Sequence, residues 1–212
     1  IEYTYDSNRI EGNTLTLHET DMVVNKGITI AGKGLREHLE AINHKEAIDF
    51  IKDIAQKKEP ISERVLLDIH AIVLHSIDKD NAGKYRRVPV IISGSKHIPP
   101  QPYLLQPQMD ELFQWYEANK DSMRPVVLAA QMHEKLVSVH PFIDGNGRTA
   151  RLLMNLILMQ HGYPIANIKG DNETRRRYYE TLEEASSGDN SAFLEFIEGV
   201  VIQSLTYYLK II

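Results

Sequence analysis

Apolar residues recur three and four positions apart through most of the chain, which is the spacing of amphipathic helices. In LREHLEAINHKEAIDFIKDIA the apolar side chains fall close to one stripe, and Pro60 follows the end of this helix. Thr16 and Glu19 form a capping box for an earlier helix that runs to about Gly27, and Ser62 caps a helix in ERVLLDIHAIVLHSI. Further helices are predicted at about 107–119, 124–139, 147–161, 174–186 and 191–210.

One segment departs from the helical period. In YRRVPVIISGSKHIPP, residues 85–100, β-branched residues lie on both sides of a Ser-Gly-Ser turn, which predicts a short β-hairpin at about 86–98. Because Pro89 has no N–H for a ladder, at least one strand should be an exposed edge or be paired only in part. No repeat or low-complexity tract is present. The predicted fold class is therefore all-α, a helical bundle with one small β-hairpin.

The composition of the chain argues against several classes of binding partner. The chain has 212 residues with 42% hydrophobic residues, 25% charged residues and a net charge of -5, so it lacks a basic footprint and we expect no nucleic-acid partner. The absence of cysteine excludes disulfides and thiolate metal sites. Apolar runs such as LLMNLILM are shorter than the ~20 residues that span a bilayer. We expect a cytoplasmic protein without a membrane partner, although the first residue, Ile1, leaves a removed leader or a further domain open.

The stretch HPFIDGNGRTAR, residues 140–151, places a glycine-rich turn directly before a strongly helical run. The turn alone would need no function. A helix N-terminus, however, offers free backbone N–H groups and a partial positive charge, which together bind anions. Arg148 and Arg151 are neighbours on the first turn of this helix, where basic residues are unfavourable unless an anion offsets them. The pattern predicts a phosphate-binding site.

Two further side chains add chemistry to this site. His140 ends the preceding helix, since Pro141 disfavours the α region for the residue before it. A histidine beside an anion site has the pKa range of a general base. Asp144 supplies one hard oxygen ligand, which suits Mg²⁺ bound together with water and phosphates. These groups predict phosphoryl or nucleotidyl transfer by positioning and charge stabilisation. By contrast, His70 and His75 are five positions apart, a spacing that does not bring two side chains to one metal ion, and we interpret them as surface or core histidines.

The same stretch matches every specified position of the signature of the Fic (filamentation induced by cAMP) family, H-P-F-x-D/E-G-N-G/K-R-x-x-R. The chain resembles, over nearly its whole length, the Fic proteins that carry an inhibitory helix before the core. The resemblance implies a Fic-type helical bundle in which the hairpin is a flap. It also implies a single Fic domain over residues 1–212, with the inhibitory helix at about 3–12 and the core at about 60–205.

Such a protein would be an adenylyltransferase that moves AMP from ATP to a protein side-chain hydroxyl and releases pyrophosphate. The resemblance makes His140 the base for the hydroxyl and Asp144 the ligand of Mg²⁺ on the α- and β-phosphates. Arg148 would grip the β-phosphate and Arg151 the γ-phosphate. The remaining phosphate contacts would come from Gly145, Asn146 and Gly147. Tyr179 and Leu182 correspond to the adenine pocket, for which core packing at i, i+3 is an equal alternative.

The resemblance also implies regulation. SNRIEGN, residues 7–13, matches the family's inhibitory motif, with Ser7 and Glu11 on one helix face. Glu11 would pair with Arg151 and obstruct the productive γ-phosphate pose; an exposed helix-end glutamate is the alternative. Leu35 lies at the position of a dimer contact, which predicts a weak homodimer. The flap would dock an extended segment of the target by strand addition. Its docking residues would be Val88, Val90, Ile91, Ile92, His97 and Ile98.

Other functions stay open from sequence. The same site could transfer another nucleotidyl or phosphate group or remove AMP, and Gly147-Arg148 favours AMP over the kinase-like relatives. A non-catalytic nucleotide-sensing or toxin–antitoxin module is a further alternative, against which the intact His140 argues. The partners would be ATP and a protein target, which could be the chain itself.

Overall fold

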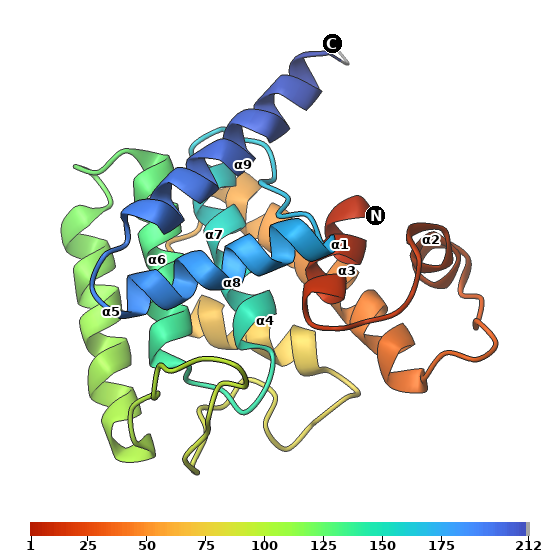
Figure 1. The fold of residues 1–212 in the computed structure, drawn as a ribbon, viewed down its shortest axis with the longest axis horizontal. Coiled ribbons are helices and arrows are strands. Elements are labelled where there is room, and N and C mark those ends of the chain that lie inside the picture. Colours follow the sequence, from red (N-terminus) through yellow and green to blue (C-terminus); the bar gives the residue numbers. More distant parts are fainter. Residues whose placement is uncertain (211–212) are drawn as a thin grey trace.

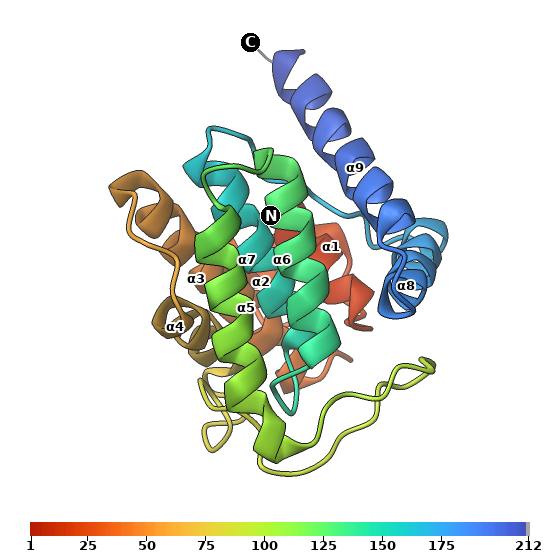
Figure 2. The same ribbon diagram turned by 90° about the vertical axis from the view of Figure 1, so that its left-hand side faces the viewer.

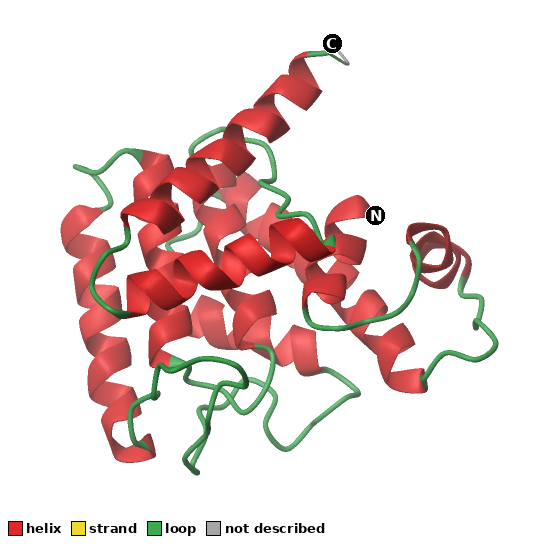
Figure 3. Ribbon diagram, in the orientation of Figure 1, coloured by secondary structure: helices red, strands yellow, loops and turns green. Residues whose placement is uncertain are grey.

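In the computed structural model, which describes residues 1–210, every regular element is a helix (Figure 3). The all-α fold class is confirmed, and every helix predicted from the apolar pattern is present, although the one capped by Ser62 ends at Leu74 rather than running on through Ile77. The helices are α1 (Glu2–Ile10), α2 (Leu17–Lys26), α3 (Leu35–Lys57), α4 (Glu63–Leu74), the short 3₁₀ helix η1 (Pro102–Leu104), α5 (Leu105–Asn119), α6 (Pro125–Val139), α7 (Asn146–Gln160), α8 (Asn172–Ser186) and α9 (Ser191–Leu209).

Helix α7 is the centre of the core. It packs against α6, α3, α4 and α1 (Figure 1). Its residues 152–158, which are apolar except for Asn155, are all buried. A helix that is apolar all round is stable only when its neighbours cover it completely. The N-terminus of α7, and the loop that leads into it, are therefore held by the whole bundle.

Helices from both ends of the chain pack around this core. Helix α1 packs on α3, α2 and α7, while α8 and α9 pack on each other and on α6 (Figure 2). The predicted capping box is formed, since Glu19 N–H donates to Thr16 Oγ1 and Thr16 N–H donates to the Glu19 carboxylate. No helix within residues 1–210 combines the length and the apolar character needed to cross a membrane.

The segment predicted as a β-hairpin turns back without forming strands. Residues 86–100 reverse direction at a turn in which Ser95 N–H donates to the Ile92 carbonyl at 3.2 Å, but the two arms show no β pairing (Figure 2). Prolines at 89, 99 and 100 remove N–H donors that a ladder would need. The base of the flap is closed instead by a buried side chain, Arg86, which is 2% exposed. Its guanidinium donates to the carbonyls of His140 at 2.9 Å, Val88 at 3.0 Å and Pro100 at 2.6 Å.

Two buried histidines support this architecture. His70 on α4 stacks on Phe142 with ring centroids 3.6 Å apart, accepts the Gly83 N–H at 3.0 Å and lies 3.0 Å from the Asp144 carbonyl. Burial lowers the pKa of His70 to about 4, and burial together with the Arg151 charge lowers the pKa of His133 to about 3. Both side chains are therefore neutral in the folded protein at pH 7.

We expect acidification to destabilise the protein before its carboxylates titrate. In the unfolded chain both histidines take up protons near pH 6.5, whereas in the folded chain they stay neutral down to about pH 4. The unfolded state thus binds more protons below pH 6.5. The free energy of unfolding should fall by about 1.4 kcal/mol per histidine for each pH unit below that value. Urea unfolding at pH 7.5, 6 and 5 measures the slope.

The matched control is His18→Gln, because His18 is an exposed residue of α2. It should leave the slope unchanged, whereas His70→Gln should reduce it. A free energy of unfolding that is equal at pH 7.5 and pH 5 would contradict the assignment of neutral buried histidines.

Candidate active site

The loop between α6 and α7 is braced by Phe142 and Asn146. Phe142 is fully buried against the ring of His70. The Asn146 side chain accepts the Phe142 N–H at 2.9 Å and donates to the Phe142 carbonyl at 2.9 Å. These bonds close the loop into a fixed shape. The side chain of Asn146, predicted to contact phosphate, thus holds the loop, and its backbone N–H is the group that faces outward from the helix end.

The start of α7 carries unpaired backbone donors. Gly145 caps the helix with φ +78°, and the first intrahelical bond is donated by Thr149 N–H to the Gly145 carbonyl at 2.9 Å. The N–H groups of Asn146, Gly147 and Arg148 have no acceptor within residues 1–210. Three parallel donors at the positive end of a helix form an anion-binding site.

Arg151 lies beneath these donors and is 1% exposed. Its Nε donates to Ser7 Oγ at 3.0 Å, and its Nη2 donates to the Ser7 carbonyl at 2.9 Å and to Glu11 Oε1 at 2.7 Å. Burial alone would lower the pKa of Arg151, but the Glu11 carboxylate raises it above its ordinary value. The guanidinium is therefore charged, and the end of α1 supplies its counter-ion. Its Nη1 donates to the hydroxyl of Tyr178 at 3.3 Å.

A cavity of about 800 Å³ opens beside this pair. Its walls include Glu11, Gly147 and Arg151. Tyr179 and Leu182, the predicted adenine contacts, also line it. Flap residues form another wall. Its volume lies within the roughly 300–1,000 Å³ of small-molecule sites. The remaining lining residues are Ile92, Ser93, Gly94, Ser95, His97, Val137, Ser138, His140, Asn172, Arg175, Arg176, Tyr178, Glu180, Glu183 and Ser186.

His140 contacts this cavity from the end of α6. Its backbone is in the left-handed region, with φ 49° and ψ 57°, so the helix ends here, as predicted from Pro141. Nδ1 lies 3.3 Å from the Val137 carbonyl, so Nδ1–H is the donor and Nε2 carries the free lone pair. Burial lowers the pKa of His140, opposed by the Val137 carbonyl and reinforced by Arg86. A neutral imidazole with one free nitrogen can accept a proton at pH 7.

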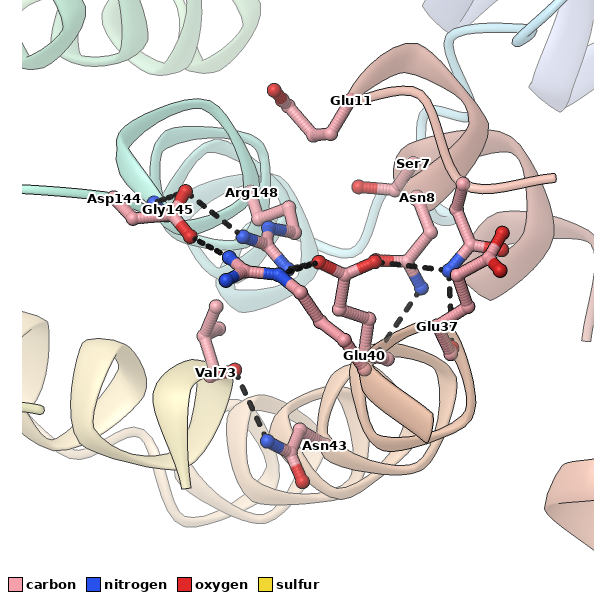
Figure 4. A network of polar contacts seen from close by, with 12 residues as sticks. Ser7, Asn8, Glu11, Glu37, Glu40, Asn43, Val73, Asp144, Gly145 and Arg148 are labelled. Atoms are coloured by element: carbon pink, nitrogen blue, oxygen red, sulfur yellow. Dashed lines mark hydrogen bonds and ion pairs between the residues drawn. The ribbon is translucent and has the colours of Figure 1, made fainter. Parts of the chain in front are cut away.

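Arg148 and Asp144 form a second charged group outside the lining of the cavity (Figure 4). Arg148 is 2% exposed and its Nη2 donates to Asp144 Oδ1 at 3.1 Å, while Nη1 lies 3.5 Å from Glu40 Oε1. Burial would raise the pKa of Asp144, but Arg148, the Gly145 N–H and Arg36 together hold it below its ordinary value. The carboxylate is therefore ionised.

The donors around Asp144 determine which metal site is feasible. Residues 1–210 contain no cluster of three histidine or carboxylate side chains that could hold a metal by itself. Asp144 is a single ionised carboxylate with a side chain that is 39% exposed. This fits Mg²⁺, which binds through one or two carboxylates and takes its other ligands from water and phosphates.

The predicted flap and dimer residues are mostly at the surface. Val88, Ile91 and Ile98 are 52%, 89% and 78% exposed, and Val90 is partly buried. His97 lies in the cavity wall, with Nε2 2.8 Å from the Ser138 carbonyl. Leu35 is 72% exposed at the start of α3 and is not among the residues that line the cavity.

Several residues of the site were not predicted from the sequence. Tyr178 differs from its neighbour Tyr179 by being fully buried, and its hydroxyl joins Arg151 to His133. Glu183 on α8 accepts bonds from Ser95 Oγ and from the Lys96 N–H, the latter at 2.8 Å, so the flap tip is tied to the cavity wall. Glu40, Arg36 and Arg86 act across long sequence separations, which leave no local signal.

Comparisons with known proteins place this geometry in context. The family model described as Fic/DOC family matches residues 60–158. A protein adenylyltransferase Fic from Nematostella vectensis is 39% identical over 211 residues, which are 99% of this chain and 48% of the relative. The chain thus spans about half the length of the curated relatives it matches.

Solved structures agree with these matches. A Fic domain containing signaling protein from Bacteroides thetaiotaomicron has a TM-score of 0.86 and 31% identity, covering 97% of this chain and 83% of that one. Fic-1 from C. elegans has a TM-score of 0.90 and 36% identity, covering 98% of this chain and 62% of that one.

Replacing Gly147 by alanine should disturb the pair between Glu11 and Arg151. A Cβ at this position would lie 2.4 Å from Glu11 Oε1 and 3.0 Å from Arg151 Nη1, so the carboxylate would have to withdraw. We expect the free energy of unfolding to fall by about 1 kcal/mol, or roughly 2–4 °C in melting temperature. In a Glu11→Gly background the same substitution should have little effect, because the clashing carboxylate is absent.

The control for helix propensity is Gly199→Ala, since a Cβ at this α9 position meets no atom within 4 Å. That variant should be neutral or slightly stabilised. Equal losses for Gly147→Ala with and without Glu11 would show that the clash is with another group.

Proposed function

The chain belongs to the Fic/DOC family, and from this membership we propose that it is a protein adenylyltransferase inhibited by its own helix α1. The observation that carries the proposal is the pair between Glu11 and Arg151 at 2.7 Å, beside three N–H groups without an acceptor in the described part of the chain and a cavity that a nucleotide could fill. A carboxylate occupies the place where an anionic substrate group would bind. The adenylyltransferase activity of relatives named protein adenylyltransferase Fic supports the choice of reaction.

The transfer uses the groups around the start of α7. The phosphates of ATP bind at the N–H groups of Asn146, Gly147 and Arg148, and the γ-phosphate takes the place of Glu11 on Arg151. Asp144 would hold Mg²⁺, which neutralises phosphate charge when bound. Arg148 and Asp144 both lie within the first turn of the helix or the loop before it, so they can reach the same phosphates.

His140 provides the base. Nε2 takes the proton from the target hydroxyl as the hydroxyl oxygen forms a bond to the α-phosphorus. The bond from that phosphorus to the bridging oxygen breaks, and pyrophosphate leaves. The product is an AMP ester of the target side chain. The N–H groups and Arg151 stabilise the charge that develops on the phosphates.

The flap supplies the docking surface for the target. Ile91 and Ile98 are largely exposed, on the two arms of the flap, which form no β pairing with each other. An extended segment of a protein target can bond to such a segment and bury these side chains. Tyr179 and Leu182 line the same cavity, and the adenine of ATP would lie against them.

Removing the Glu11 carboxylate should activate the protein. In Glu11→Gly, Arg151 is free to orient the γ-phosphate, and a well-aligned charge contact contributes a few kcal/mol in the transition state. We expect AMP transfer to rise by roughly 100-fold or more. The measurement is transfer of labelled AMP at one ATP concentration, with mass spectrometry of the modified protein.

Two double variants serve as controls. Glu11→Gly/His140→Ala should be inactive, and Glu11→Gly/Arg151→Ala should not regain the rate, because the group that orients the phosphate is lost. Equal rates for the native chain and Glu11→Gly would disprove the inhibition. A modified protein without the mass of AMP would replace adenylyl transfer by another group transfer, and nucleotide turnover unaffected by His140→Ala would support a non-catalytic module.

We also propose a weak homodimer that uses Leu35. This side chain is 72% exposed at the beginning of α3, where it covers no part of the core. Sedimentation of the native chain at tens of micromolar should show a dimer fraction that Leu35→Asp removes. Ile202→Asp is the matched control, since Ile202 on α9 is 62% exposed, and it should leave the fraction unchanged. A native chain that is monomeric at these concentrations would overturn the proposal. The cytoplasmic location stays a prediction from sequence.

A further inference from the structure

The carboxylate of Asp144 already has a cationic partner that comes from a different helix. Arg36, the second residue of α3, places Nη2 2.5 Å from Asp144 Oδ2. The same guanidinium places Nε 3.1 Å from Glu40 Oε1, one turn further along α3. Arg36 thus bridges the carboxylates of Glu40 and Asp144, which are 104 positions apart in sequence.

The two carboxylate oxygens of Asp144 have different partners, and only the partner of Oδ2 is exposed enough to move away. Oδ1 accepts the Gly145 N–H at 2.6 Å and Arg148 Nη2 at 3.1 Å, both held by the core. Oδ2 has Arg36 as its partner. The side chain of Arg36 is 60% exposed, whereas that of Arg148 is 2% exposed. A cation that approaches from solvent therefore meets Arg36 at Oδ2, and Arg36 is the group that can move away.

Glu40 is positioned to receive the displaced arginine. Its side chain is 12% exposed, and Oε2 accepts the side-chain N–H of Asn13 at 3.0 Å, which fixes the carboxylate in place. Arg36 Nε already contacts Oε1. Arg36 can leave Asp144 without losing its second partner, so its displacement leaves no unpaired charge.

We propose that Arg36 competes with the divalent cation for Asp144 and pairs with Glu40 alone when the cation binds. The inference rests on the proposed function, in which Asp144 is the metal ligand. In the nucleotide-free protein Arg36 acts as the resident counter-ion of the metal-binding carboxylate. Binding of the cation then includes the loss of an ion pair, which reduces its affinity. Arg36 also repels the incoming double charge.

The test is binding of Mn²⁺ to the 212-residue chain in the presence of ADP, with free Mn²⁺ measured by electron paramagnetic resonance. ADP supplies the α- and β-phosphates but has no γ-phosphate to compete with Glu11. Arg36→Gln should bind Mn²⁺ about threefold to tenfold more tightly than the native chain, since an exposed ion pair and one repulsive charge are removed. Asp144→Asn should lose the site.

The matched control is Arg64→Gln on α4, which removes an equally charged, exposed arginine paired with Asp68 at 2.9 Å. It should leave Mn²⁺ affinity unchanged. Equal tightening in Arg36→Gln and Arg64→Gln would attribute the effect to net charge and overturn the competition, as would no tightening in Arg36→Gln. If Asp144→Asn bound Mn²⁺ like the native chain, the metal site of the proposed function itself would be wrong.

Discussion

The pairing of one buried guanidinium, that of Arg151, organises this protein. A charge that is 1% exposed is tolerated only when it has counter-charge and hydrogen-bond partners, and breaking such a pair by removing one member leaves an unpaired buried charge. Arg151 lies at the positive end of α7, where nothing in its own helix can offset it. The partners come from α1, through Ser7 and Glu11. The position of α1 on the bundle is thus coupled to the charge state of the anion site.

This coupling depends on the loop between α6 and α7, which is held in one conformation by its contacts. Phe142 is stacked on His70, Asn146 bonds to both backbone groups of Phe142, and Arg86 donates to the His140 carbonyl. His140, the N-terminus of α7 and the base of the flap therefore form one unit. The left-handed backbone of His140 is maintained by these surrounding contacts, because an isolated residue with a side chain rarely adopts it.

The sequence predicts what local pattern and charge placement determine. Helical periodicity and caps locate the bundle, and the turn before α7 locates the anion site, because both depend on residues within a few positions. The conformation of the flap could not be predicted in this way. Its β-branched residues favour strands, but its prolines and the bonds from the Arg86 side chain determine its conformation. Arg148 sits three residues before Arg151, but pairs with Glu40 from α3, a contact without a sequence signal.

Three arginines near the start of α7 each have protein carboxylates as partners in this structure. Arg151 pairs with Glu11, whereas Arg148 and Arg36 share Asp144 and Glu40. In the proposed function, bound phosphates and a metal ion would have to replace these existing partners. The free energy of binding is then smaller than at an unpaired site, because each new ion pair replaces an existing one. In the proposed function, the resting state is thus stabilised by the same groups that AMP transfer would use, and helix α1 itself would supply the inhibitory carboxylate.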